Sequence, residues 1–243
     1  MKGELKDRTK PLGGKAYGSI PHLPGSRRGP NDYGLSDAQA AILTTRTRDR
    51  RDLVIVEEKL DGGCVSAAKI GGPIVALTRA GYHATAGDFK HHHLWAQFVE
   101  DFRDRFKALL IEGERVVGEW CVMAHGTRYA LPHRPFVAFD IMEGKRRLPW
   151  QERRDRVERA GLPQPALLHA GGPLSVAAAV AMLEGGSAHG ALDTVEGAVW
   201  RVERDGVCDF LGKYVQPGKV DGCYLSSVTG GGDRWNTWTG WTP

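Results

Sequence analysis

The sequence lacks a long apolar run. None of its 243 positions begins a stretch approaching the roughly 20 hydrophobic residues that a transmembrane helix needs. The first residues, MKGELKDRTKPLGGK, are polar and contain no apolar core of signal-peptide length. We therefore expect a cytoplasmic protein that has no membrane partner.

Cysteine is scarce and scattered. The four cysteines, Cys64, Cys121, Cys208 and Cys223, lie far apart and form no C-x-x-C pair. This spacing argues against a zinc ribbon and against a disulfide scaffold. We expect them to be small buried side chains in a reducing compartment.

Strong charge of one sign is also missing. The formal net charge is +4 and the sequence pI is about 8.9, which is compatible with a nucleic-acid partner but does not establish one. Arginines gather at residues 44–52 and 145–159, but acidic residues dilute both runs. We expect each run to form a solvated face.

Hydrophobic periodicity predicts both helices and strands, without an internal repeat or a domain linker. A short helix should begin at Ser36 or Asp37, and a long one should cover residues 87–110, where aromatic residues recur at helical spacing. Two further helices are expected at 149–161 and 174–186. Strands are expected at 53–58, 64–70, 74–79, 115–122, 135–142, 197–204 and 207–215. Because the strands come in groups, the pattern indicates a mixed α+β domain.

The stretch VIVEEKLDGG, residues 54–63, leads a buried strand directly into a lysine set among carboxylates and glycines. Partial desolvation and nearby cationic charge can deprotonate such a lysine, and the free amine can then attack a phosphate. The glycines would let a nucleotide approach the backbone closely. A structural turn after a strand would explain the same stretch.

Five further fragments follow Lys59 in a fixed order. They contain Arg79, Gly118-Glu119, Phe139-Asp140-Ile141, Glu196-Gly197, and Lys213 with Lys219. With these fragments, residues 50–225 resemble the lysine-adenylating nucleotidyltransferase superfamily of ATP-dependent polynucleotide ligases and capping enzymes. The segment 118–141 is the most specific, and it resembles RNA ligases in particular.

The resemblance implies a fold. This would be an α+β nucleotidyltransferase (ATP-grasp-like ligase) adenylation domain over residues 51–225, with mixed or antiparallel sheets. Residues 1–50 would form an arm and a short helix packed on this domain, and residues 226–243 would form a short tail. The tail leaves no room for the OB-fold domain of DNA ligases and capping enzymes. The oligomeric state is open, with a monomer as the default.

The resemblance also implies roles at the nucleophile and the adenine. Lys59 would attack the α-phosphate of ATP and form lysyl-AMP, and Asp61 and Gly62 would complete the nucleophile motif. Glu58 would lie near the adenine edge. Phe139 would stack on adenine, a geometry that aromatic rings favour.

Other charged residues would serve the phosphates and a metal. Glu119 would hold the ribose or a divalent metal, Glu196 would bind a catalytic metal, and Lys213 would contact the AMP phosphate. Arg79 would contact the ribose or the phosphate of the incoming strand. An in-line phosphoryl displacement needs positioning and positive charge more than proton chemistry. A carboxylate-held hard cation suits Mg²⁺ or Mn²⁺.

Two positions depart from the pattern of the family. Many RNA ligases have an asparagine where this chain has Cys64, and cysteine is a poor partner for Mg²⁺-bound water. The closing motif is often K-x-K, whereas Val215 stands at the second lysine position after Lys213. Lys219 is a candidate replacement for that lysine and a candidate nucleic-acid contact.

Three polar features each allow two interpretations. His125 is either a structural hydrogen-bonding residue or a contact to a substrate phosphate. The histidines at 91–93 could bind metal, but on a helix they point to different faces, so we expect solvent exposure. Asp140 is expected to make structural hydrogen bonds, with a supporting role at a metal as the alternative.

The tryptophans are similarly open. Trp200 is expected in the core rather than as a stacking platform for RNA. Trp235, Trp238 and Trp241 recur every three residues, and they either fold back over the core or stack on bases.

The sequence thus predicts an enzyme, an ATP-dependent RNA ligase. Its cofactors would be ATP and Mg²⁺ or Mn²⁺, and its partner would be RNA with 5′-phosphate and 3′-hydroxyl ends. One alternative is a DNA ligase that acts on nicked duplex. The other is a nucleic-acid or nucleotide-binding module that has lost catalysis.

Overall fold

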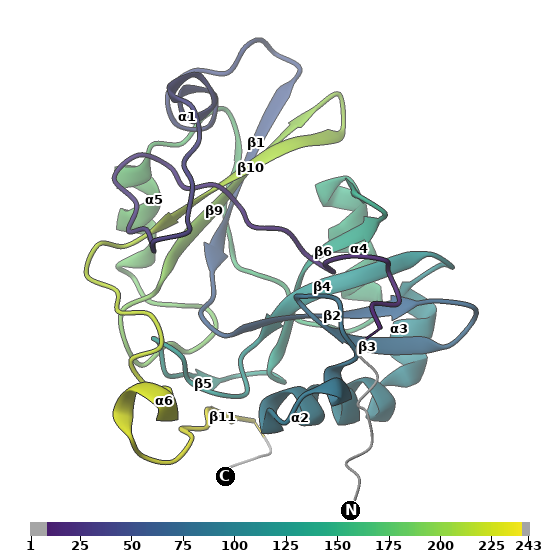
Figure 1. Cartoon of the computed structure of the whole chain (residues 1–243). Coiled ribbons are helices and arrows are strands. Elements are labelled where there is room, and N and C mark those ends of the chain that lie inside the picture. Colours follow the sequence, from purple (N-terminus) through teal and green to yellow (C-terminus); the bar gives the residue numbers. More distant parts are fainter. Residues whose placement is uncertain (1–8, 240–243) are drawn as a thin grey trace, which may run out of the picture.

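Two antiparallel sheets dominate the computed structural model, which describes residues 9–239 (Figure 1). The first sheet has the order β10-β9-β1-β8 and the second the order β3-β2-β4-β6-β7. The strands of the first sheet are β1 (Asp52–Lys59), β8 (Leu167–Gly171), β9 (Gly197–Arg204) and β10 (Val207–Val215). Those of the second are β2 (Gly63–Lys69), β3 (Ile74–Thr78), β4 (Glu114–Trp120), β6 (Phe136–Glu143) and β7 (Arg146–Arg147). The antiparallel sheets and the α+β class agree with the prediction.

The chain crosses from one sheet to the other directly after Lys59. Strand β1 lies in the first sheet and β2 in the second, with residues 60–62 between them. Lys59 therefore stands at the junction of the two sheets, where a side chain can reach the space between them.

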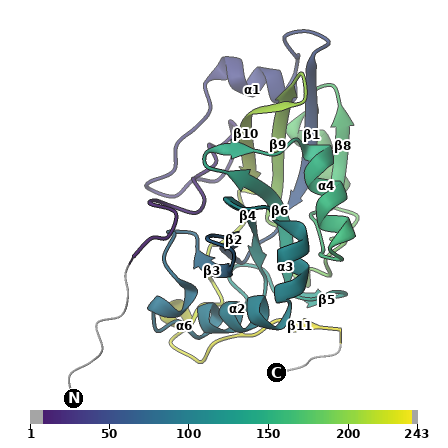
Figure 2. The ribbon, with the colours of Figure 1, turned by 90° about the vertical axis from the view of Figure 1, so that its right-hand side faces the viewer.

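Each sheet buries its own apolar core. Helices α1 (Asp37–Thr44) and α5 (Val176–Leu183) pack on the first sheet around the fully buried Trp200. Helices α2 (Lys90–Asp101), α3 (Arg103–Leu109) and α4 (Trp150–Arg159) cover the second sheet around Trp95 (Figure 2). Trp200 thus lies in the core, as predicted. Separate cores leave the space between the sheets free for a site.

The start of α1 follows a local sequence signal, but one expected helix is broken. Ser36 caps α1 through a capping box with Gln39, as its side chain predicts. The long helix expected at 87–110 is instead two helices, because Phe102 leaves the helical region with φ −110° and ψ 21°. The ring of Phe102 contacts the ring of Phe98 at a tilt of 45° and lies under the guanidinium of Arg134.

Several short elements were not predicted from the sequence. They are β8, the 3-10 turn Ala84–Ala86, β7, helix α6 (Ser226–Thr229), and β5 (Ala130–Leu131), which pairs with β11 (Thr237–Trp238). The pairing of β11 brings the C-terminal segment back onto the domain. Trp235 and Trp238 accordingly pack against the core, whereas Trp241 lies outside the described residues.

Burial differs from expectation at the histidines and cysteines. His93 is exposed, but His91 and His92 are half-buried, because their rings contact each other and the His91 ring faces His125. Among the cysteines only Cys121 is buried, while the other three are half-buried, and all four are free thiols. No helix in residues 9–239 combines the length and the apolarity that a bilayer crossing requires.

Candidate active site

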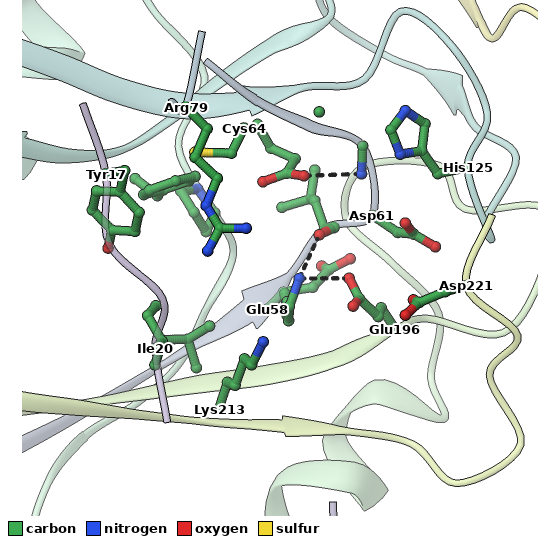
Figure 3. A pocket seen from close by; sticks show the side chains of 18 of the residues that line it. Tyr17, Ile20, Glu58, Asp61, Cys64, Arg79, His125, Glu196, Lys213 and Asp221 are labelled. Atoms are coloured by element: carbon green, nitrogen blue, oxygen red, sulfur yellow. Dashed lines mark hydrogen bonds and ion pairs between the residues drawn. The ribbon is translucent and has the colours of Figure 1, made fainter. Parts of the chain in front are cut away.

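A cavity of about 550 Å³ opens between the two sheets. Figure 3 shows Tyr17 and Ile20 on one side of it and His125 and Asp221 on the opposite side. We call Lys59, Asp61, Glu119, Glu196 and Lys213 the charged end, and Tyr17, Ile20, Phe139, Val199 and Leu211 the apolar end. Of the site residues expected from the sequence, ten line the cavity, and Lys219 does not.

Lys59 presents its amine to the cavity from the last position of β1. Its Nζ donates to Glu196 Oε2 at 2.7 Å and to the carbonyl oxygen of Leu60 at 3.3 Å. The side chain of Lys59 is 20% exposed and that of Glu196 is 8% exposed. Strand register brings the two together, since Lys59 pairs with Gly197, the residue after Glu196.

Lys59 and Glu196 are largely shielded from solvent, and the pKa values of both groups are shifted. Burial alone would lower the pKa of Lys59, but Glu196 and Glu119 outweigh it and raise that pKa above 10.5. Burial raises the pKa of Glu196 to about 7, although Lys59 opposes the shift. The free protein therefore stores Lys59 as an ammonium beside a weak acid of near-neutral pKa.

Glu119 approaches the nucleophile loop from the other sheet. Its Oε1 accepts a hydrogen bond from the backbone N–H of Gly62 at 3.0 Å. A Cβ at Gly62 would lie 2.8 Å from the carbonyl oxygen of Trp120, so only glycine allows this close approach of β4. Burial raises the pKa of Glu119, and Lys59 opposes that shift.

Asp61 faces inward and organises the loop after the nucleophile. Its Oδ2 accepts from the backbone N–H of Gly126 at 3.0 Å and from Thr127 Oγ1 at 3.3 Å. Its own backbone N–H donates to the hydroxyl of Tyr129 at 3.0 Å. Asp61 thus makes three hydrogen bonds to the segment 126–129.

Lys219 lies behind Asp61 rather than in the cavity. Its buried ammonium donates to the carbonyl oxygens of Gly126 and Thr194 and to the hydroxyl of Thr127. Its Nζ lies 3.7 Å from Asp61 Oδ2. Because an ammonium has three N–H donors, this arrangement uses all of them and leaves none for nucleic acid.

Two other cations reach the cavity. Lys213 on β10 lies 3.9 Å from Asp32, and burial together with the charge of Lys59 lowers its pKa. Arg79, which follows β3, donates to Ser19 Oγ at 3.0 Å and is otherwise exposed. Figure 3 shows both side chains directed into the cavity, where they can face an anion.

Strand alternation separates the two glutamates that precede Lys59. Val54, Val56 and Glu58 share one face of β1, and the Glu58 carboxylate accepts from the hydroxyl of Ser187 after α5. Glu57 shares the face of Lys59, and its Oε1 accepts from Trp150 Nε1 at 3.0 Å and from Arg153. Both glutamates border the cavity, but the alternation points the side chain of Glu57 toward it. Glu57 is not among the site residues expected from the sequence, although strand alternation from Val54 and Val56 predicts that its side chain shares the face of Lys59.

Three remaining side chains have distinct surroundings. His125 lines the cavity, and within residues 9–239 its ring makes no hydrogen bond. Cys64 lies opposite Glu119 in the sheet, and burial raises the pKa of its thiol, which therefore stays neutral. Asp140 is buried and accepts from Tyr17, Arg147 and Arg201, which agrees with the expected structural role.

The donor set at the charged end fits some metals better than others. Within the described part of the chain, no group of three or more His, Cys, Asp or Glu side chains forms a preorganised metal site. Mg²⁺ commonly takes only one or two carboxylates and completes its shell with water and substrate phosphates. Glu119 and Glu196 fit that role, whereas a closed structural zinc site does not fit.

Solved structures of ligases share this fold. The chain matches the Naegleria gruberi RNA ligase with pyrophosphate at a TM-score of 0.50 and 18% identity, covering 69% of this chain and 50% of that one. It matches a mutant of the same ligase with ATP and Mn at 0.51 and 15%, covering 84% and 58%. An archaeal ATP-dependent RNA ligase matches at 0.48 and 25%, covering 80% and 48%. The chain thus spans about half the length of these relatives.

Comparison with curated proteins found no match. The family model described as RNA ligase, however, matches residues 52–215, which is more than half of the chain. The matched segment begins at β1 and ends at β10, so it contains Lys59, Glu119, Phe139, Glu196 and Lys213. The chain belongs to the RNA ligase family.

Proposed function

We propose that this protein is an ATP-dependent RNA ligase that joins 5′-phosphate and 3′-hydroxyl ends through a lysyl-AMP intermediate. One observation carries the proposal. Lys59 lines the cavity at the junction of the sheets, and its Nζ lies 2.7 Å from Glu196 Oε2. Membership of the RNA ligase family supports the substrate class.

The cavity suits a nucleotide at both ends. Its volume of about 550 Å³ falls within the usual range for small-molecule sites. Phe139 and the aliphatic side chains of the apolar end offer faces for a base. Lys59, Lys213 and Arg79 offer cations for phosphates. A nucleotide would therefore lie with its base toward Phe139 and its α-phosphate toward Lys59.

In the first step, the nitrogen of Lys59 attacks the α-phosphorus of ATP. A P–N bond forms, the bond from the α-phosphorus to the bridging oxygen breaks, and pyrophosphate leaves with the electron pair. The ammonium must first lose a proton, and Glu196 is the acceptor within hydrogen-bond distance. Burial raises the pKa of Glu196 to about 7, which makes it a stronger base than an exposed glutamate, although the pKa of Lys59 remains the higher of the two.

Lys213 and Arg79 would stabilise the charge that develops on the phosphate oxygens during this step. Lys213 lies near Asp32 and Arg79 donates to Ser19, so each cation would exchange a protein contact for a phosphate oxygen when the nucleotide binds. Glu119 and Glu196 would hold Mg²⁺ or Mn²⁺, which would supply Lewis-acid charge for the phosphates.

The remaining steps use the same cavity. An oxygen of the RNA 5′-phosphate attacks the phosphorus of lysyl-AMP, which breaks the P–N bond and frees Lys59. The 3′-hydroxyl of the second end then attacks the adenylated 5′-phosphorus, and AMP leaves. Asp61 would keep the loop after Lys59 in place through its hydrogen bonds to segment 126–129.

Labelled ATP tests the first step. Incubated with ATP labelled at the α-phosphate and Mg²⁺, the wild-type protein should acquire a covalent, acid-labile AMP. Lys59→Ala should abolish the adduct, and the exposed Lys145→Ala should leave it unchanged. An absent wild-type adduct, or one that persists in Lys59→Ala, would refute the mechanism.

The substrate class needs a second experiment. Matched 5′-phosphorylated strands of RNA and DNA, offered single-stranded and as nicked duplexes, should show joining of RNA ends. Efficient sealing of nicked all-DNA duplex with no RNA joining would instead identify a DNA ligase.

A further inference from the structure

An N-terminal segment lines part of the cavity. Residues 16–23, which we call the arm, run from the end of β3 to β10 (Figure 1). At the first sheet, the backbone N–H of Lys213 donates to Pro21 and that of Leu23 donates back to Lys213. The arm therefore continues the first sheet beyond β10 for a few residues.

The arm is also fixed at the second sheet. The backbone N–H groups of Ala16 and Tyr17 donate to the carbonyl oxygen of Arg79 at 3.1 and 3.3 Å. Arg115 Nε donates to the carbonyl oxygen of Ala16 at 2.7 Å. Residues 18–20 span the gap between these anchors, and Gly18 and Ile20 line the cavity. A segment tied to both sheets and facing the cavity can act as one of its walls.

Tyr17 is held from several directions. Its hydroxyl donates to Asp140 at 3.0 Å, and the guanidinium of Arg147 lies over its ring at 5.2 Å. The ring meets Phe139 edge to face, with centroids 5.2 Å apart and planes inclined by 62°. Because Tyr17 is only 5% exposed, it cannot turn away, and its ring fixes the plane of Phe139.

Ile20 completes the apolar surface. Tyr17, Val117 and Met142 form a buried cluster, and Ile20, Cys64 and Phe139 pack against it while remaining partly exposed. Figure 3 shows Ile20 pointing into the cavity from the arm. The atoms that Ile20 and Phe139 leave uncovered thus face the same space.

We propose that the arm is a wall of the nucleobase subsite, in which Ile20 contacts the base of the bound nucleotide and Tyr17 positions Phe139 for stacking. The proposal rests on the proposed function for the identity of the nucleotide. It assigns a nucleotide-binding role to residues that lie before the segment matched by the family model.

Ile20→Ala is the main test, with binding measured by calorimetry for AMP and for inorganic pyrophosphate. Loss of the aliphatic contact should weaken AMP binding about three- to tenfold. Pyrophosphate binding should not change, because pyrophosphate has no base. Ile20→Leu should retain AMP binding within about twofold, because it keeps the apolar volume. Tyr17→Phe should weaken AMP binding about threefold, because it frees the ring from Asp140.

Leu35→Ala is the matched control, since Leu35 packs on the first core and does not line the cavity. It should change neither binding constant. Unchanged AMP binding in Ile20→Ala, or equal weakening for AMP and pyrophosphate, would overturn the proposal. Lysyl-AMP formation by the wild type is scored separately, so a failed arm proposal is distinguishable from a failed ligase proposal.

Discussion

The charged and apolar ends of the cavity are held in different ways. At the charged end the nucleophile Lys59 pairs with another group of the same end, Glu196. At the apolar end Tyr17 is held by Asp140 and Arg147, which do not line the cavity. The charged end must therefore exchange its internal contacts for phosphate when a nucleotide binds, whereas the apolar end is already preorganised.

From this difference we expect the charged end to determine the rate of lysine adenylation and the apolar end to determine the affinity for the nucleotide. Substitutions at the charged end should lower the rate of lysine adenylation, because its groups act on the reacting atoms. Substitutions at the apolar end should weaken nucleotide binding and leave the rate at saturation largely intact. Four experiments, from the largest expected effect to the smallest, examine this division.

Glu196→Ala should lower the rate of lysyl-AMP formation at saturating ATP by about 100-fold or more, because it removes the proton acceptor of Lys59 and a proposed metal ligand. Single-turnover labelling measures the rate, and calorimetry should show AMP binding altered by much less. Glu184→Ala, an exposed glutamate after α5, is the matched control. A rate within about threefold of wild type would contradict the claim that the groups of the charged end act on the reacting atoms.

Phe139→Ala should weaken AMP binding about tenfold through loss of stacking. The saturating rate of lysyl-AMP formation should stay within about threefold of wild type. Phe89→Ala removes an aromatic ring that is 63% exposed and serves as the control. If Phe139→Ala instead lowers the saturating rate while AMP still binds normally, the apolar end takes part in chemistry.

The two lysines of the cavity should have pKa values on opposite sides of 10.5, the ordinary value for lysine. The carboxylates raise the pKa of Lys59 in the folded protein. The ion pair of Lys59 therefore stabilises the fold fully below pH 10.5, and this stabilisation is lost as the pH rises through the higher folded pKa. Burial lowers the pKa of Lys213. Competitive acetylation followed by mass spectrometry should therefore modify Lys213 at lower pH than Lys59. In Glu196→Gln the midpoint for Lys59 should fall, and an unchanged midpoint would contradict the pairing.

Cys64→Ser should have the smallest effect on adenylation and on AMP binding. The experiment distinguishes whether Cys64 contributes to the charged end or to the apolar end of the cavity. Cys64 faces Glu119 but packs against the Tyr17 cluster. A neutral thiol is a poor ligand for Mg²⁺, so the Mg²⁺ concentration for half-maximal adenylation should stay within about twofold of wild type. AMP binding should weaken by about twofold through altered packing. A large shift in the Mg²⁺ requirement would assign Cys64 to the charged end.

Local patterns were informative where the chain forms regular elements. The apolar run at residues 54–56 predicted the strand that became β1, and Ser36 or Asp37 was expected at the start of α1. The fragments around Glu119, Phe139, Glu196 and Lys213 were each placed at a strand end or on a strand, and the structure brings all four to one cavity. Whether each has its proposed role stays a prediction.

Long-range contacts carried no comparable signal. Nothing near Lys219 indicates that its ammonium is used by Gly126, Thr127 and Thr194. The arm reads as a Gly- and Pro-rich loop, and Tyr17 is separated from Phe139 by more than a hundred positions. Glu57 is intermediate, because its face follows from strand alternation once Lys59 is known to point into the cavity.

The sequence by itself determined β1 to β4, β6, β9 and β10, most helices, the place of Lys59 at a strand end, and the residue types able to bind phosphate. These depend on neighbouring residues, on periodicity and on side-chain chemistry. Only the tertiary structure decided that Lys59 meets Glu196, that Lys219 lies behind Asp61, and that the arm faces Phe139. Such contacts depend on strand register and on the packing of two sheets, which join residues far apart in the chain.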